Sequence, residues 1–411
     1  MKPAMFVPCA QGVEALLASE LQAITGQPAR AARGGAWVPG DLAAAMRINL
    51  ECRLGQRVLW PLTDGPYRDE RDLYELARRV PWPEWITPQQ TLRVDVSAQR
   101  SPLRSLNFAA LRVKDAVCDA LREASGERPS VDTRHPTLPL VLFLDATHAW
   151  LYADTSGEAL FKRGWRDARG GGQAVKGEAP LKETLAAAML AAADWRGRAE
   201  DGALLDPFCG AGTIAIEAAQ IACGMAPGLQ RRFAFEQQRP FVPLRAAWQQ
   251  LKQAARARVH APAVAVFASD VSFRMTDFAA RNAERAGVAQ AIEFKTADAL
   301  QRLPPAPRGT LLMNPPYGER IAPKGRGTAA REGFEGGEDA AAFFAALATH
   351  WKRHYPGWTA WCLSPEMKLP SLMRLQESRR VPMWNGGIEC RLFRFELVAG
   401  SHKPAVRAPA A

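Results

Sequence analysis

A polar tetrapeptide follows an apolar run in the C-terminal half of the chain. Residues 311–313 predict a buried strand, and Asn314, Pro315, Pro316 and Tyr317 follow it directly. The two prolines make the strand exit rigid and lack N–H donors. The Asn314 side-chain oxygen and the Pro315 carbonyl can accept the two N–H groups of an exocyclic base amine, which makes its nitrogen a better nucleophile. Tyr317 can stack on a flipped base.

A glycine-rich turn ends an earlier apolar strand. Residues 203–205 predict a buried strand that ends at Asp206, and a helix begins at Ile214. Between them lie Pro207, Phe208, Cys209, Gly210, Ala211, Gly212 and Thr213. Glycines before a helix let the backbone approach a nucleotide ligand closely. The turn also fits the fingerprint G-x-G-x-x-A, so by itself it does not distinguish NAD from S-adenosylmethionine.

Carboxylates also end the next two predicted strands. Asp270 follows the apolar run 264–268, and Asp298 follows the run 292–297. Asp270 lies 64 residues beyond Asp206 (270 − 206), whereas a dinucleotide fold places its acidic residue roughly 20 residues on. Asp270 can accept the ribose hydroxyls of an adenosine, and Asp298 can accept its adenine amino group. Each could merely cap the next helix, but together with the glycine turn they favour a nucleoside cofactor.

Strands that alternate with helices must bring these strand ends to one edge. Helix and strand signals alternate over 161–400, which predicts an α/β domain with a doubly wound, mostly parallel sheet of the Rossmann type. In this domain, Asn-Pro-Pro-Tyr at a strand end after a glycine turn favours an amine site over a simple proline turn with a packed tyrosine.

The N-terminal part predicts two smaller α/β units. The first, residues 1–50, begins a helix at residue 12, and a second predicted helix spans 42–58. Proline and glycine at Pro61, Gly65 and Pro66 predict a break in the chain. The second unit, 51–160, shows a strand, a helix and two further strands. Residues 401–411 predict a disordered tail.

A basic segment with aromatic residues lies between Asp206 and Asp270. The formal net charge of the chain is +11, which predicts a polyanionic partner. Within residues 226–258 the cations are Arg231, Arg232, Arg239, Arg245, Lys252, Arg256 and Arg258, and the aromatics are Phe233, Phe235, Phe241 and Trp248. Phosphate contacts with base stacking and a solvated helix whose aromatics face the core are equally open interpretations.

Several other classes of protein do not fit the composition. The seven cysteines are scattered without a C-x-x-C pair and the six histidines fall singly, so we expect neither a disulfide framework nor a bound metal. No run approaches the roughly 18 apolar residues of a membrane span, and the first residues lack the apolar region of a secretory signal. We therefore expect a cytoplasmic protein.

The two strand-end motifs, residues 204–213 and 314–320, resemble those of class I, S-adenosylmethionine-dependent guanine-N2 RNA methyltransferases that carry a THUMP domain. The resemblance spans nearly the whole chain and includes residues 154–157, 163–167 and 179–188. It is closest to the bacterial 23S rRNA enzymes, and it corresponds to the N-terminal half of those in which two methyltransferases are fused. We expect one activity, because the chain is too short for two.

The resemblance implies a fold, a cofactor and a partner. It implies a ferredoxin-like piece over 1–50, a THUMP domain over 51–160 and a methyltransferase domain over 161–400. The family packs the stretch 179–188 over S-adenosylmethionine, which makes Lys182 and Thr184 secondary cofactor contacts, although a capped helix is the alternative. The THUMP domain would bind RNA through local basic patches that include Arg93, Arg100, Arg104, Arg112 and Lys114.

The implied reaction forms N2-methylguanine in 23S rRNA or in a large-subunit assembly intermediate, at the guanine 2445 type of target. A tRNA guanine-N2 methyltransferase is an alternative. A DNA adenine-N6 methyltransferase is another, because Asn-Pro-Pro-Tyr serves any planar exocyclic amine, but the N-terminal units argue against it. The intact motifs disfavour a non-catalytic RNA-binding assembly protein, and an NAD-dependent dehydrogenase leaves Asn314 without a role. Neither a membrane nor an obligate protein partner is implied.

Overall fold

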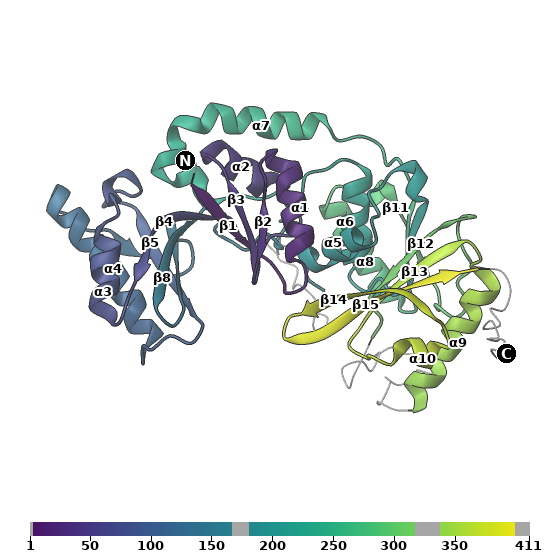
Figure 1. Cartoon of the computed structure of the whole chain (residues 1–411). Helices are drawn as coiled ribbons and strands as arrows, with labels where there is room; N and C mark the ends of the chain where they lie inside the picture. Colours follow the sequence, from purple (N-terminus) through teal and green to yellow (C-terminus); the bar gives the residue numbers. More distant parts are fainter. Residues whose placement is uncertain (1–2, 167–180, 317–337, 399–411) are drawn as a thin grey trace. The chain divides into compact units, whose positions relative to one another are not determined.

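The chain forms two compact units in the computed structural model, which describes residues 3–166, 181–316 and 338–398 (Figure 1). Of these residues, the first unit contains 3–166, 182–188 and 224–260. The second unit contains 181, 189–223, 261–316 and 338–398. The predicted tail over 401–411 lies outside the described residues.

The first unit is built on one sheet, whose described strands follow the order β2-β3-β1-β4-β8-β7-β5-β6. Its strands are β1 (Ala4–Pro8), β2 (Arg30–Ala32), β3 (Gly35–Pro39), β4 (Leu59–Pro66), β5 (Thr91–Ala98), β6 (Ser130–Val131), β7 (Leu138–Leu144) and β8 (His148–Asp154). Strand β4 joins the two halves, because it pairs with both β1 and β8. The predicted break at Pro61, Gly65 and Pro66 is therefore wrong: these residues belong to β4, and Pro61 lies at an irregularity in its pairing with β8.

Capped helices pack their apolar faces on this sheet. They are α1 (Glu14–Thr25), α2 (Leu42–Glu51), α3 (Glu70–Arg78), the short η1 (Trp82–Glu84) and α4 (Leu106–Ser125). The side chains of Asp41, Asp69 and Ser105 cap α2, α3 and α4 by accepting backbone N–H groups. The α3 and α4 helices bury the alternate leucines of β7 in a common core. The second helix ends at Glu51, well before the predicted residue 58.

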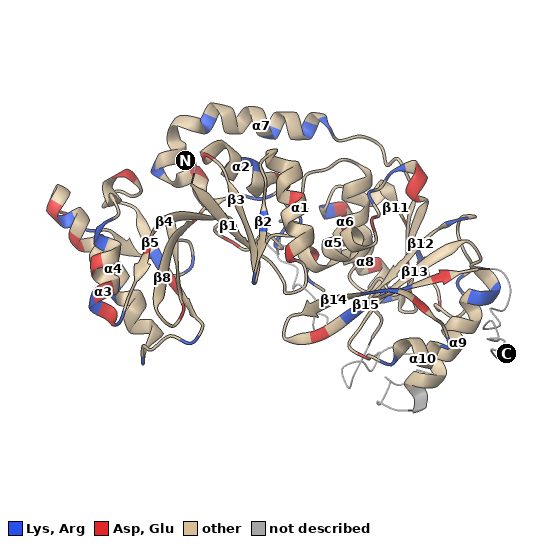
Figure 2. Ribbon diagram, in the orientation of Figure 1, with Lys and Arg blue, Asp and Glu red and all other residues tan. Residues whose placement is uncertain are grey.

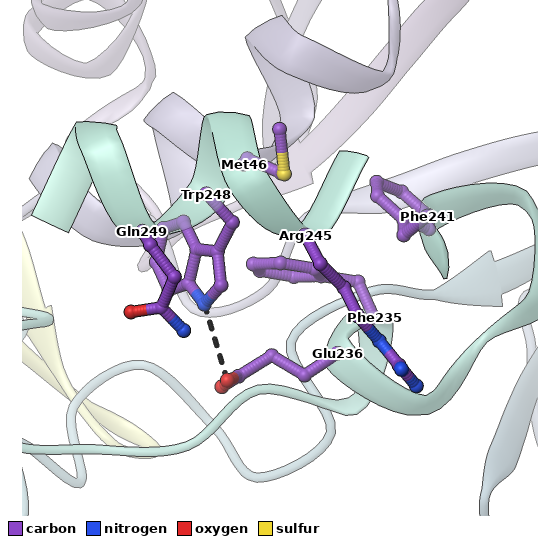
Figure 3. Close-up of a pocket in the computed structure, with 7 residues that line it drawn as sticks. All are labelled: Met46, Phe235, Glu236, Phe241, Arg245, Trp248 and Gln249. Atoms are coloured by element: carbon purple, nitrogen blue, oxygen red, sulfur yellow. Dashed lines mark hydrogen bonds between the residues drawn. The ribbon is translucent and has the colours of Figure 1, made fainter. Parts of the chain in front are cut away.

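The basic segment of the chain packs within the first unit. It forms the short helices η3 (Ala234–Gln237) and η4 (Arg239–Leu244) and the helix α7 (Arg245–Ala257). Its aromatic residues are buried and pack on one another, with the Phe235 and Trp248 ring centroids 4.9 Å apart. Figure 3 shows these rings beside Met46 of α2, and the Trp248 indole N–H donates to Glu236 at 3.1 Å. The interpretation in which the aromatics face the core is the correct one.

Cations of the same segment bind backbone carbonyls and carboxylates of the first unit. Arg231 donates to the carbonyls of Glu158 and Ala159 at 2.6 and 2.8 Å, and burial lowers its pKa to about 10. Arg258 pairs with Glu51 at the end of α2. The exposed side of α7 still carries Arg245 and Arg256, and Figure 2 shows basic but no acidic residues along this helix.

The second unit is a doubly wound sheet, which confirms the predicted fold class. Its described strands follow the order β11-β10-β9-β12-β13-β15-β14. Strand β15 alone runs in the opposite direction to the other described strands. The strands are β9 (Ala203–Asp206), β10 (Val266–Asp270), β11 (Ile292–Thr296), β12 (Gly309–Met313), β13 (Trp358–Ser364), β14 (Glu377–Asn385) and β15 (Ile388–Leu397).

The helices of the second unit lie on both faces of its sheet. They are α6 (Thr213–Ala222), α8 (Phe273–Arg285), α9 (Glu338–His354), α10 (Leu369–Met373) and the short η2 (Ala199–Asp201) and η5 (Ala289–Ala291), while α5 (Glu183–Ala192) begins in the first unit. The α6 and α8 helices pack on β9 to β11, whereas α9 and α10 share a core with β12, β13 and β15. Because the strand order reverses between β9 and β12, right-handed crossovers place these two groups on opposite faces.

A buried hydrogen-bond network closes the first unit where β8 ends. The Asn49 amide donates to Thr155 Oγ1 at 2.8 Å and accepts from the Ser156 hydroxyl at 2.6 Å. The Ser156 hydroxyl in turn accepts from Val58 N, and the Thr155 hydroxyl donates to Val58 O, both at 2.8 Å. The network therefore ties α2 to the start of β4 and the end of β8.

We predict that Asn49→Ala destabilises the first unit. The substitution removes the acceptor of the Ser156 hydroxyl and one donor to Thr155, and the free energy of unfolding should fall by about 1–3 kcal/mol. Urea unfolding measures this change. Ser19→Ala on the exposed side of α1 serves as the control and should change the stability by less than about 0.5 kcal/mol. Equal effects of the two substitutions would contradict the prediction.

Candidate active site

The glycine turn follows the central, fully buried strand β9. Strand β9 pairs in parallel with β10 on one side and β12 on the other. Gly210 and Gly212 have φ values of +49° and +82°, a region that favours glycine. A Cβ at Gly212 would lie 3.0 Å from the Ala279 Cβ, whereas the space beside Gly210 is open to 4 Å. Gly212 thus permits close packing of α6 on α8, and Gly210 leaves its side of the turn free.

Two carboxyl groups, the buried Asp206 and the half-buried Asp270, hold the turn in place. Asp206 Oδ1 accepts from Phe208 N at 3.1 Å, and Asp270 Oδ2 accepts from Gly210 N at 3.0 Å. The Cys209 N–H donates to Ser269 O at 2.9 Å, so the turn is attached to the end of β10 at two points. Thr213, the first residue of α6, is also buried.

Burial changes the acidity of both carboxyl groups. Burial raises the pKa of Asp206 to about 8; the Phe208 N–H opposes this rise and the neighbouring Asp270 charge adds to it. Burial also raises the pKa of Asp270, against the lowering effect of the N–H groups of Ser272 and Gly210. Carboxyl groups with raised pKa values beside a cradle of backbone N–H groups are typical of functional sites.

Two exposed apolar residues follow Asp270, and the sequence analysis did not identify them. Val271 and Phe273 are 66% and 74% exposed, at the junction between β10 and α8. Such exposure costs free energy unless a ligand covers the side chains. An apolar residue directly after a strand-end carboxylate is the sequence signal that could have identified Val271.

Asp298 begins a turn beyond β11. Its carboxylate accepts from Leu300 N at 2.9 Å, and its carbonyl accepts from Gln301 N and Arg302 N. The residue lines a cavity of about 310 Å³ together with Lys295, Thr296, Ala297, Gln301, Arg302 and Leu303. The capping contact and a ligand contact are compatible, because a carboxylate accepts several hydrogen bonds.

The predicted amine site begins where β12 ends. Asn314 Oδ1 is buried and accepts no hydrogen bond from the described residues. A buried polar atom without a partner is costly, and it indicates a contact made with a ligand or water. Pro315 is buried and Pro316 is half-buried, while Tyr317 lies outside the described residues.

The strand order brings most of the predicted residues to one edge. Strands β11, β10, β9 and β12 are consecutive and parallel, so Asp298, Asp270, Asp206 and Asn314 all follow the carboxyl ends of neighbouring strands. The order of the strands along the chain reverses between β9 and β12. In open α/β sheets, ligands bind beside the carboxyl ends of the strands at this switch point.

Lys182 and Thr184 belong to the first unit and are not brought to this edge by any described contact. The Lys182 ammonium lies 5.1 Å from the centre of the Phe161 ring, and Thr184 is buried at the start of α5. Between them, Glu183 pairs with Arg166 at 2.9 Å. Their role in cofactor binding stays a prediction.

Some residues of the predicted basic patches in the first unit form ion pairs with acidic neighbours. Arg93 pairs with Asp95 at 2.7 Å, and Lys114 and Arg112 both contact Asp115. Arg100 and Arg104 are exposed. Figure 2 shows acidic and basic residues side by side along α3 and α4. The prediction that this set contacts phosphate therefore rests mainly on Arg100 and Arg104.

The described residues contain neither a metal cluster nor a membrane-spanning helix, and the cysteines are buried. All seven cysteines are buried free thiols, and burial raises the pKa of Cys209 in the turn. Within the described ranges, no group of three His, Cys, Asp or Glu residues could hold a metal ion. No helix of the described chain is long and apolar enough to cross a membrane.

Three parts of the chain match known protein families. Residues 171–394 match the RMKL-like methyltransferase domain, residues 67–154 the THUMP domain, and residues 4–59 the RlmL ferredoxin-like domain. The "Ribosomal RNA large subunit methyltransferase K/L" of Shewanella baltica is 34% identical over 401 residues, which cover 96% of this chain and 53% of the relative. The chain thus spans about half the length of the curated relatives it matches.

Two solved structures share the fold over nearly the whole chain. SMU.472, crystallised as a complex with SAH, has a TM-score of 0.82 at 23% identity and covers 98% of this chain and 100% of its own. A protein of Listeria monocytogenes named as a predicted N6-adenine-specific DNA methylase has a TM-score of 0.80 at 25% identity, with 96% of each chain covered. The expected ferredoxin-like, THUMP and class I methyltransferase architecture is confirmed. The chain belongs to the RMKL-like methyltransferase family.

Proposed function

We propose that the chain transfers a methyl group from S-adenosylmethionine to the exocyclic N2 of a guanine in 23S rRNA, at the guanine 2445 type of target. The observation that carries this proposal is the buried Asn314 Oδ1 at the switch point of the sheet, which accepts no hydrogen bond from the residues that the structure describes. The names of the curated relatives support a large-subunit rRNA substrate. An rRNA partner also agrees with the net charge of +11.

The residues at the sheet edge fit S-adenosylmethionine. The open side of Gly210 and the N-terminus of α6 leave room for the amino-acid part of the cofactor. The Asp270 carboxylate can accept the ribose hydroxyls, and Val271 can cover one face of the adenine ring. Asp206, which is mostly neutral near pH 7, would ionise next to a bound cation.

The chemistry follows from the acceptors at the end of β12. When bound, the cofactor supplies a methyl group made electrophilic by a positively charged sulfur. Asn314 Oδ1 and the Pro315 carbonyl accept the two N–H groups of the guanine amine, which concentrates its lone pair on nitrogen. The rigid strand exit holds both acceptors before the base arrives, so positioning supplies much of the rate.

A DNA adenine-N6 methyltransferase is the second candidate, because the Listeria neighbour carries that name. The decisive experiment incubates the full chain and S-adenosylmethionine with unmodified 23S rRNA and with duplex DNA. Mass mapping of the products should show N2-methylguanine in the rRNA and no N6-methyladenine in the DNA. The opposite result would replace the proposed function by the DNA activity.

We predict that Asn314→Ala lowers kcat much more than it weakens cofactor binding. Loss of an acceptor that acts in the transition state should reduce kcat by roughly 10²–10³-fold. Cofactor affinity, measured by calorimetry, should stay within about twofold, because the substitution lies outside the adenosine contacts. Asn107→Ala on the exposed side of α4 is the matched control. Equal losses in kcat and cofactor affinity would contradict the role of Asn314.

We predict that Asp270→Asn acts mainly on cofactor affinity. A hydrogen bond to a charged group contributes about 1.5–3 kcal/mol, so the Kd for S-adenosylmethionine should rise tenfold or more. Asp277→Asn on α8 serves as the control, because Asp277 is partly exposed and pairs only with Arg281 among the described residues. An unchanged Kd in Asp270→Asn would exclude the ribose contact.

We predict that the stability of the free protein depends on pH through Asp206. The pKa of this carboxyl is about 8 in the folded chain and about 3.9 in an unfolded chain. The folded state therefore keeps a proton that the unfolded state releases, and its contribution to stability is lost as the pH rises from about 4 to about 8. The variant Asp206→Asn lacks this ionisation and should gain stability relative to the wild type over that range. Thermal unfolding at several pH values measures the difference, and parallel curves would contradict the prediction.

A further inference from the structure

The last two strands of the second unit form a rigid hairpin. Strands β14 and β15 pair antiparallel from Glu377 and Phe395 to Asn385 and Ile388, the pair beside the loop. Gly386 and Gly387 form the two-residue loop, and Gly386 has a φ of +63°, as tight hairpin loops require. The hairpin is visible in yellow in Figure 1.

The hairpin extends past the edge of the sheet that carries Asn314. Strand β13 runs parallel to β12 and ends at Ser364, which pairs with Arg391 of β15. Residues 388–390 of β15 and 383–385 of β14 pair beyond that point. Three residue pairs extend a hairpin by roughly 10 Å. The tip therefore projects on the carboxyl side of the sheet, the side to which Asp206 and Asn314 also belong.

One face of this hairpin alternates cations and aromatic rings. The Arg380 guanidinium lies 5.2 Å from the centre of the Phe393 ring, and the Arg391 guanidinium lies 5.8 Å from the centre of the Trp384 ring. Phe393 is fully buried in the core of the second unit. Trp384, in the projecting part, is half-buried and lies outside that core cluster.

The Trp384 and Arg391 pair is held in a defined geometry. Arg391 forms an ion pair with Glu389 at 2.6 Å and donates to the Cys390 carbonyl at 2.9 Å. Its guanidinium still has further N–H groups for other acceptors, although the ion pair offsets part of its charge. The arginine is thus oriented beside the indole before any ligand binds. A planar indole beside a fixed guanidinium suits a nucleobase, whose ring stacks on the indole and whose phosphate meets the cation.

We infer that Trp384 and Arg391 bind an unpaired nucleotide adjacent to the methylated base. The inference rests on the proposed function and adds a positioning surface to it. Strand β14 lies three strands from β12, which corresponds to roughly 14 Å. This separation is too large for contact with the base held by Asn314, so the hairpin contacts a neighbouring nucleotide and helps to fix the register of the RNA.

The test measures binding of an unmodified 23S rRNA transcript to the full chain in a filter assay. The substitution Trp384→Ala removes one base stack and should weaken rRNA binding roughly tenfold. Trp384→Phe keeps an aromatic ring and should retain most of the rRNA affinity. In Trp384→Ala the KM for rRNA should rise by a similar factor. Its kcat at saturating rRNA and its Kd for S-adenosylmethionine should stay within about twofold of the wild-type values. Arg391→Ala should weaken rRNA binding less than Trp384→Ala.

The control is Arg308→Ala, which removes an exposed arginine from the opposite, amino-terminal edge of the sheet before β12. Its rRNA affinity should match that of the wild type. Wild-type rRNA affinity in Trp384→Ala would overturn the inference, and so would a matching loss of cofactor binding, which indicates a structural role. If the hairpin variants lose rRNA affinity but the wild type forms no N2-methylguanine, the proposed function fails while the hairpin surface stands.

Discussion

The structure of the candidate site depends on the hydrogen bond between the Asp270 carboxylate and the Gly210 amide. This bond joins the carboxyl ends of β9 and β10 and fixes the glycine turn above the sheet. It also places a half-buried carboxyl group beside the glycine turn that leads into α6. Because β9 pairs with β12 on its other side, the same arrangement sets the position of Asn314. Each functional group at this edge is thus placed by a neighbouring strand.

The strand-end residues could be predicted from the sequence because their signals are local. Asp206, Asp270 and Asn314 each follow a short apolar run, and parallel strands bring such ends to one edge. Val271 and Phe273 were missed because exposure is not visible in the residue type. The role of Pro61 was predicted wrongly, since a proline at an irregular strand position needs no break in the sheet. The end of α2 was placed too late, because its C-cap is Cys52, a residue type that gives no helix-stop signal.

The aromatic residues of the basic segment show where sequence reasoning reached its limit. Four rings among seven cations fit a nucleic-acid surface and a buried cluster equally well. The structure distinguishes the two, because Phe235 and Trp248 are buried against α2 and the Trp248 indole is satisfied by Glu236. The cations divide as well: Arg231 is occupied by backbone carbonyls, whereas the exposed arginines of α7 remain available. Only tertiary packing carries this information.

The path of residues 224–260 has a consequence for the autonomy of the two units. The polypeptide leaves the second unit after α6, contributes four rings to the interior of the first, and returns to form β10. No single cut can therefore release an intact catalytic sheet, since a fragment that starts after residue 188 would expose those rings to water. The chain passes between the two units more than once, so the folding of each unit depends on residues that flank the other in sequence.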